Sequence, residues 1–186
     1  DRTGLQHRHA FARQLHMRIV RSNHAHGRIV AIDTAEARAM PGVVAVWTAQ
    51  DIADIEPGDF REGPIEKLAP YRQPVLAKDK VRYVGDPVAA VFAEDPYIAE
   101  DAAELVNVEI EPLPPVLDAR GEPGEFSPGR DTEADVLRQG YGDVDAVFAQ
   151  AHTIVELDLT SGRHSGVPLE TRGALGRYDA SRDVLE

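Results

Sequence analysis

The chain contains no cysteine. It therefore forms no disulfide and holds no cysteine-ligated iron–sulfur cluster. No window approaches the roughly 20 consecutive apolar residues that a membrane-spanning helix requires, so we expect no membrane span and a cytoplasmic location. Basic residues are outnumbered: 20 Lys and Arg stand against 32 Asp and Glu, for a formal net charge of −12. Without a dense basic stripe, no nucleic-acid partner is expected.

Several catalytic motifs are also missing. No G-x-G-x-x-G sequence follows a predicted strand, and no phosphate-cradling P-loop occurs. No nucleophile elbow surrounds any of the few serines. The run Gly140-Tyr141-Gly142 is too short to count as a phosphate-binding loop. These absences give no support to nucleotide binding or serine hydrolysis.

The most informative stretch that is present covers residues 73–118. Its pattern predicts strands over 80–84 and 87–93, a helix, and a further strand over 107–111. The second strand is almost continuously apolar, which is typical of a strand covered on both faces. Gly85 lies between the first two strands, where a tight link is needed, and is predicted to have a positive φ.

The helix within this stretch has a clear start signal. Asp95 is placed to act as its N-cap, and Pro96 suits the first helical position. Ile98, Ala102 and Leu105 follow at helical spacing, so we expect this stripe to face the protein interior.

Upstream, residues 15–21 and 28–32 are predicted to be partner strands, joined by a turn-rich link that contains His24 and His26. On an extended chain these two imidazoles would face the same side. A metal site is one interpretation, but it needs further ligands that the sequence does not obviously supply. A polar loop with local hydrogen bonds is the favoured interpretation.

The segment after this link predicts short elements and a long loop. Asp33 and Glu36 have capping-box spacing and predict a short helix. Residues 43–47 are predicted to form a strand, residues 48–52 a short helical piece, and residues 54–71 a surface loop.

Beyond residue 118 the composition changes. Residues 119–142 are rich in Gly and Pro, which is typical of a linker. Asp143 is predicted to cap a short helix, and strands are predicted over 153–159 and 174–178.

Glu170 and Arg172 are the candidate site residues of this last segment, because on a strand they would share one face. One interpretation places them at the floor of a cofactor pocket. The other, which we favour, is a structural ion pair or backbone contacts at a strand end.

Three separated segments carry a resemblance to a known family: residues 15–52 (LHMRIVRSNHAHGRIVAIDTAEARAMPGVVAVWTAQDI), residues 73–118 (QPVLAKDKVRYVGDPVAAVFAEDPYIAEDAAELVNVEIEPLPPVLD) and residues 165–179 (SGVPLETRGALGRYD). In this order they resemble the molybdenum-binding large subunits of the xanthine dehydrogenase, aldehyde oxidase and carbon monoxide dehydrogenase family. The resemblance covers most of the chain.

The resemblance implies an α+β fold in four parts. Residues 1–14 depart from the family's pattern and are expected to be a variable or disordered N-terminus, and residues 15–118 would be an α/β hammerhead domain. Residues 119–142 would be the linker, and residues 143–186 the first strands of a molybdopterin-binding domain. The chain would then be the N-terminal portion of a large subunit, either as a fragment or as one part of a naturally split subunit.

The same resemblance implies a molybdopterin-bound molybdenum in the complete enzyme. The implied partners are the remainder of the large subunit and the iron–sulfur and FAD subunits. The family's catalytic glutamate and glycine-rich cofactor loops match no residue of this chain. We therefore expect no catalytic residue, no bound cofactor and no activity in this chain alone. A non-catalytic module that docks redox subunits is the alternative function.

If the tail opens a larger domain, some of its apolar residues would lack partners and could drive self-association. These residues are Leu157, Leu159, Val167, Leu169 and Leu175.

Overall fold

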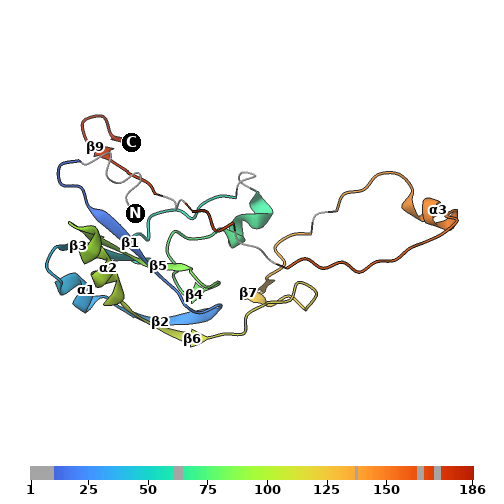
Figure 1. Cartoon of the computed structure of the whole chain (residues 1–186), viewed down its shortest axis with the longest axis horizontal. Coiled ribbons are helices and arrows are strands. Elements are labelled where there is room, and N and C mark those ends of the chain that lie inside the picture. Colours follow the sequence, from blue (N-terminus) through green and yellow to red (C-terminus); the bar gives the residue numbers. More distant parts are fainter. Residues whose placement is uncertain (1–10, 61–64, 137, 163–165, 170–172) are drawn as a thin grey trace. The chain divides into compact units, whose positions relative to one another are not determined.

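The computed structural model describes residues 11–60, 65–136, 138–162, 166–169 and 173–186. These residues fall into two compact units. The main unit is Ala12–Leu137, and the tail unit includes Arg138–Glu186. Both helices and strands occur, in small antiparallel sheets, as an α+β fold requires (Figure 1).

The first sheet of the main unit is built around one buried central strand. Its order is β1-β5-β3, and both pairings are antiparallel. The strands are β1 (His16–Arg21), β5 (Pro87–Ala93) and β3 (Val43–Thr48). Val88, Ala89, Ala90, Val91 and Ala93 of β5 are all buried. The apolar run is therefore a strand enclosed by neighbours and largely covered on its two faces, as predicted.

A second sheet has the order β4-β2-β6, again antiparallel. Its strands are β4 (Lys80–Val81), β2 (Gly27–Asp33) and β6 (Asn107–Pro112). Ile29, Val108 and Ile110 turn toward a small core with Val81 and Val88. The opposite side carries the charged residues, with Arg28 Nε lying 3.1 Å from Glu111 Oε2. This alternation is typical of a sheet with one face in water.

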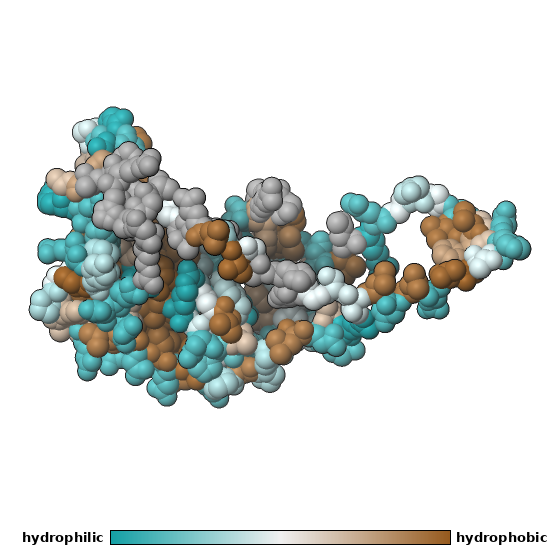
Figure 2. Space-filling view, in the orientation of Figure 1, coloured by the Kyte–Doolittle hydropathy of each residue, from teal (hydrophilic) through white to brown (hydrophobic). Residues whose placement is uncertain are grey.

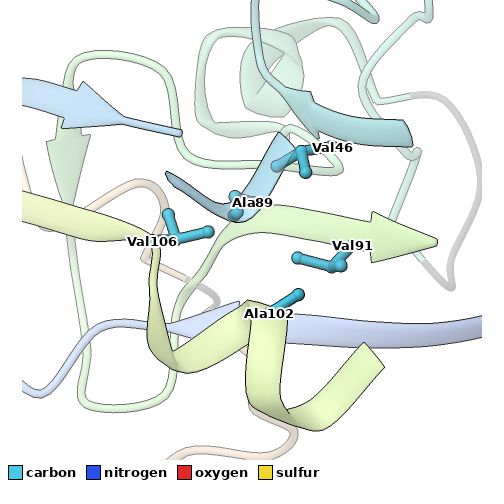
Figure 3. Close-up of a cluster of buried hydrophobic side chains, with 6 residues drawn as sticks. Val46, Ala89, Val91, Ala102 and Val106 are labelled. Carbon is cyan, nitrogen blue, oxygen red and sulfur yellow. The ribbon is translucent and has the colours of Figure 1, made fainter. Parts of the chain in front are cut away.

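Two helices cover one face of the first sheet, α1 (Ala35–Ala39) and α2 (Pro96–Glu104). Figure 3 shows side chains from β3, β5 and the α2 region converging in this core. Its buried members are Ala37, Val46, Ala89, Val91, Ala102 and Val106. Ile32 and Val108 pack against both this cluster and the core of the second sheet, so the two sheets share one interior.

The N-cap of α2 is confirmed, but its inward stripe is only partly correct. Asp95 Oδ1 accepts hydrogen bonds from the amides of Tyr97 and Ile98, at 2.8 and 3.4 Å. Ala102 is fully buried, whereas Leu105 is 40% exposed. Leu105 is the C-cap residue, where the helix ends. The buried face is therefore lined by the small residues Ala99 and Ala102, which let the helix approach the sheet closely.

The predicted pairing of residues 15–21 with residues 28–32 is wrong. β1 pairs with β5, and β2 pairs with β4 and β6 in the other sheet. The link after β1 is held by β5 instead: the Ser22 amide donates to the Asp86 carbonyl at 2.9 Å, and the Gly85 amide donates to the Ser22 carbonyl at 2.7 Å. These bonds direct the chain away from a hairpin and into the second sheet.

Three predictions for the elements over residues 33–71 also differ from the structure. The N-cap of α1 is Thr34 and makes no side-chain cap bond, although Asp33 Oδ1 accepts from the Ala35 amide at 2.9 Å. Residues 49–54 form turns rather than a helical piece, because Asp51 Oδ2 accepts from the Thr48 amide and closes the chain tightly. The predicted loop over 54–71 includes the 3-10 helix η1 (Glu66–Tyr71).

Residues 119–142, predicted as a linker, contain a short hairpin. It is formed by β7 (Glu125–Ser127) and β8 (Arg130–Asp131). The ring of Phe126 lies 4.6 Å, centroid to centroid, from that of Tyr71. The hairpin, itself part of the main unit, thereby contacts η1 through an aromatic pair.

The tail unit holds α3 (Val144–Ala149) and a hairpin of β9 (Tyr178–Asp179) and β10 (Val184–Leu185). Asp143 Oδ1 accepts from the Ala146 amide at 2.9 Å, so the predicted cap is confirmed. The strand predicted over 153–159 does not form, since none of the strands in the described part of the chain pairs with it. Of the predicted strand over 174–178, only its last residue lies in β9. Across the described ranges, every helix is too short or too polar to cross a membrane.

Gly85 has φ +94°, as predicted. An added Cβ would meet no atom within 4 Å, so the cost of a side chain here comes from the backbone alone. We predict that Gly85→Ala lowers the free energy of unfolding by about 1–2 kcal/mol, the cost of a left-handed conformation for an L-residue. Urea unfolding followed by the fluorescence of the single tryptophan, Trp47, measures it.

The matched control is Gly58→Ala. A Cβ added at Gly58 would also meet no atom within 4 Å, but Gly58 has no positive φ. Its substitution should leave the free energy of unfolding nearly unchanged. Equal unfolding curves for both variants would contradict the assignment of strain to Gly85.

Candidate interaction surface

Glu170 and Arg172, the two candidate site residues, lie outside the residues that the structure describes. Much of the predicted N-terminal segment, residues 1–10, does so as well. The pairing or cofactor role of Glu170 and Arg172 therefore stays a prediction.

The two histidines of the link after β1 have different surroundings. His26 Nδ1 lies 3.0 Å from the carbonyl oxygen of Pro114, just beyond β6. His24 Nδ1 is buried and has no hydrogen-bond partner among the described residues. No group of three or more His, Cys, Asp or Glu residues with metal-binding spacing occurs in the described part of the chain. His26 thus fastens the link to the end of β6.

A polar cluster holds the turn before β5. Asp86 Oδ2 accepts from the Arg82 amide at 2.9 Å, and Arg21 Nη1 donates to the Gly85 carbonyl at 2.8 Å. Burial raises the pKa of the Asp86 carboxyl, while the hydrogen bond from the Arg82 amide opposes that rise. Because carboxylate burial is costly without partners, this turn depends on its hydrogen bonds.

Arg82 extends this cluster to the β7–β8 hairpin. Its guanidinium lies 3.8 Å from the ring centroid of Phe126, and Nη1 donates to the Phe126 carbonyl at 3.1 Å. Burial lowers the pKa of the guanidinium. Sequence reasoning missed this contact, because 44 residues separate the partners and neither belongs to a motif. Its role is to anchor the hairpin.

The tail unit presents the most unusual surface. None of the described residues in 138–186 is buried. Leu157 and Leu159 are 74% and 84% exposed, and the other apolar residues expected to lack partners, Val167, Leu169 and Leu175, are exposed too. The expectation of exposed apolar side chains in this segment is therefore confirmed.

The helix α3 adds to this surface. Val144, Val147 and Phe148 are exposed, together with Tyr141 just before the helix, and they line an open depression. Figure 2 shows brown, hydrophobic side chains gathered on the part of the tail unit that carries α3. An apolar helix face and an unpaired apolar segment are features of an interface rather than of a finished fold.

The only regular pairing in the described tail, at its β9–β10 hairpin, rests on polar contacts. The amide and carbonyl groups of Arg177 and Glu186 exchange hydrogen bonds at 2.8 and 2.9 Å. Arg182 donates to Asp179 and to Glu186. A two-stranded hairpin of this size is marginal without a packed face, so it supplies no core for the tail.

Comparison with known proteins identifies the class. The family model described as aldehyde oxidase and xanthine dehydrogenase, a/b hammerhead domain, matches residues 6–114. The model described as molybdopterin cofactor-binding domain matches residues 128–186. The first match alone covers more than half of the chain, so this chain belongs to the aldehyde oxidase and xanthine dehydrogenase family.

Individual relatives agree. The 6-hydroxypseudooxynicotine dehydrogenase complex subunit gamma of Paenarthrobacter nicotinovorans is 47% identical over 180 residues, covering 92% of this chain and 22% of that protein. The carbon monoxide dehydrogenase large chain of Afipia carboxidovorans is 39% identical over 184 residues, covering 89% and 22%. These relatives are oxidoreductases by name, and this chain spans about a fifth of their length.

A solved structure shows the same fold. The crystal structure of quinoline 2-oxidoreductase from Pseudomonas putida 86 matches with a TM-score of 0.67 and 35% sequence identity. The match covers 92% of this chain and 22% of that one. The predicted family and the predicted fold, a hammerhead domain followed by the beginning of a molybdopterin-binding domain, are thereby confirmed.

The exposed tail predicts self-association of the chain on its own. We expect the 186-residue chain to sediment as a concentration-dependent oligomer, because its apolar segments would exclude water by pairing with a second copy. A version that ends at Leu137 keeps the β7–β8 hairpin and should sediment as a monomer. Analytical ultracentrifugation over a hundredfold range of concentration compares them, and two monomers would contradict the prediction.

We predict opposite pH effects at two carboxyls, Asp86 in the polar cluster and Asp51 beside Thr48 at the end of β3. The pKa of Asp86 is raised above 3.8 by burial, so its contribution to stability falls as pH rises from that value through the folded-state pKa. The free energy of unfolding of the Asp86→Asn variant, relative to that of the unsubstituted chain, should therefore increase as pH rises through that range. Urea unfolding at a series of pH values measures this difference.

Asp51 is the matched control. Hydrogen bonds from Thr48 lower its pKa below 3.8, so its stabilising contribution is lost as pH falls below that value. Asp51→Asn should destabilise the chain more at higher pH and less as the folded-state pKa is approached. Parallel pH profiles for the two variants would show that burial does not dominate at Asp86.

Proposed function

We propose that this chain supplies the hammerhead domain and the opening part of the molybdopterin-binding domain of a molybdenum hydroxylase large subunit. The domain junction falls within residues 119–142 in this proposal. The chain acts in an oxidoreductase only as part of a complex. The proposed partners are the rest of the large subunit, together with iron–sulfur and FAD subunits.

One contrast within the chain carries this proposal. The main unit has a continuous buried core around β5, whereas none of the described tail residues in 138–186 is buried. The described residues of the tail, which matches the molybdopterin cofactor-binding model, therefore form no interior of their own. A segment of this kind acquires a core when a larger domain surrounds it.

The described residues do not fit a molybdopterin site by themselves. A large anionic cofactor needs many backbone amides converging from glycine-rich turns. Within the described tail, Gly142 is the glycine with a positive φ, and it lies at the start of the six-residue helix α3. We therefore assign no chemical step to this chain and propose that, alone, it holds no molybdenum and has no dehydrogenase activity.

A chimera tests the proposal. The segment of the 6-hydroxypseudooxynicotine dehydrogenase subunit gamma that matches this chain is replaced by the chain itself, and the chimera is co-expressed with the other subunits of that complex. We expect a purified complex that contains molybdenum, measured by mass spectrometry, and that oxidises its substrate at a reduced but measurable rate. The 186-residue chain, expressed in the same host, should contain none.

The control is subunit gamma with the matched segment deleted, which should fail to assemble. A chimera that folds into the complex without molybdenum or activity would contradict the proposed function. So would stoichiometric molybdenum in the purified 186-residue chain.

A further inference from the structure

The β1-β5-β3 sheet carries apolar side chains on both of its faces. Val46, Ala89 and Val91 belong to the face that α1 and α2 cover. Arg18 lies on that same side, since its Nη2 is 2.9 Å from Glu100 Oε1 on α2. Alternate residues must project from the other face.

Strand register defines this second face. Met17 pairs with Phe92, which in turn pairs with Ala45. At the next residues on the same face, two along each strand, Ile19 pairs with Ala90, which pairs with Trp47. We call this set, with Leu15 just before β1, the Trp47 face: Leu15, Met17, Ile19, Ala45, Trp47, Ala90 and Phe92.

One end of this face is covered and the other is open. Val88, on the same side of β5, is buried against Ala77 and Val81. Toward the other end, Met17 is 58% exposed and Trp47 is 45% exposed. The Trp47 ring packs on Phe92 with centroids 4.5 Å apart, so the aromatic pair is ordered by its neighbours while still open to solvent.

The second sheet shows what a solvated face looks like in this protein. Its outer side carries the ion pair between Arg28 and Glu111 and the exposed Glu109. The Trp47 face has no charged member. Sheets that are apolar on both sides are normally covered on both sides, and depletion of charge around aromatic residues marks the centre of an interface.

We infer that the Trp47 face is an internal docking surface for the part of the large subunit that lies outside this chain. This inference rests on the proposed function. The relatives that carry the same segment devote 22% of their length to it, so about four-fifths of each polypeptide remains to supply the covering layer. The occupant is an apolar layer of that polypeptide, with Trp47 and Phe92 as its central contacts.

Met17→Glu tests the inference in two settings. In the 186-residue chain the glutamate points into water, so circular dichroism and the urea midpoint should match those of the unsubstituted chain. In the chimera with subunit gamma, the same carboxylate would be buried without a partner. We expect the yield of assembled complex to fall at least tenfold.

Val30→Glu is the matched control. Val30 lies in β2 of the second sheet and is 54% exposed, close to the value for Met17. It should leave both the chain and the chimera intact. The Trp47 emission maximum and acrylamide quenching of the free chain should also stay unchanged as its concentration rises.

The outcomes separate the two proposals. An unsubstituted chimera that fails to assemble overturns the proposed function and this inference with it. An unsubstituted chimera that assembles, together with a Met17→Glu chimera that assembles equally well, overturns the inference alone. Burial of Trp47 in the free chain as its concentration rises would identify a second copy as the occupant and would also overturn it.

Discussion

Burial of β5 is the constraint on which the main unit depends. This strand pairs on both edges, packs under α2 on one face and reaches the core of the second sheet through Val88 on the other. The turn before it is fixed by the positive φ of Gly85 and by hydrogen bonds to Ser22. Because these contacts meet at one strand, the apolar run, the turn and the helix that follows form one cooperative unit.

Local signals in the sequence predict this unit well. The apolar run of β5, the Asp95 cap and Gly85 are each specified within a few residues, so pattern and propensity suffice. The partner of β1 is different, because it depends on a pairing between segments about 70 residues apart. Nothing near residues 15–32 reveals that Ser22 bonds to Asp86 and directs β2 into another sheet. The contact of the Arg82 guanidinium with the Phe126 ring could not be predicted for the same reason, because its partners lie far apart in the sequence.

The candidate site shows a different limit. The alternating pattern over 153–159 is a genuine strand pattern, but a strand forms only when a neighbour accepts its hydrogen bonds. Leu157 and Leu159 are exposed, so the alternating apolar pattern is present in the sequence although no strand forms over these residues. A cofactor role for Glu170 and Arg172 could not be read from spacing, because such a role depends on residues that surround the pair in space.

We propose that the chain combines a self-sufficient hammerhead core with a tail that needs further polypeptide. Hydrogen–deuterium exchange of the 186-residue chain tests it most directly, at a concentration low enough to keep the chain monomeric. We expect strong protection of the amides of β5 and its partner strands, and exchange over residues 153–162 nearly as fast as in an unfolded chain. Strong protection of residues 153–162 in the monomer would instead show that the tail completes its own fold without further polypeptide.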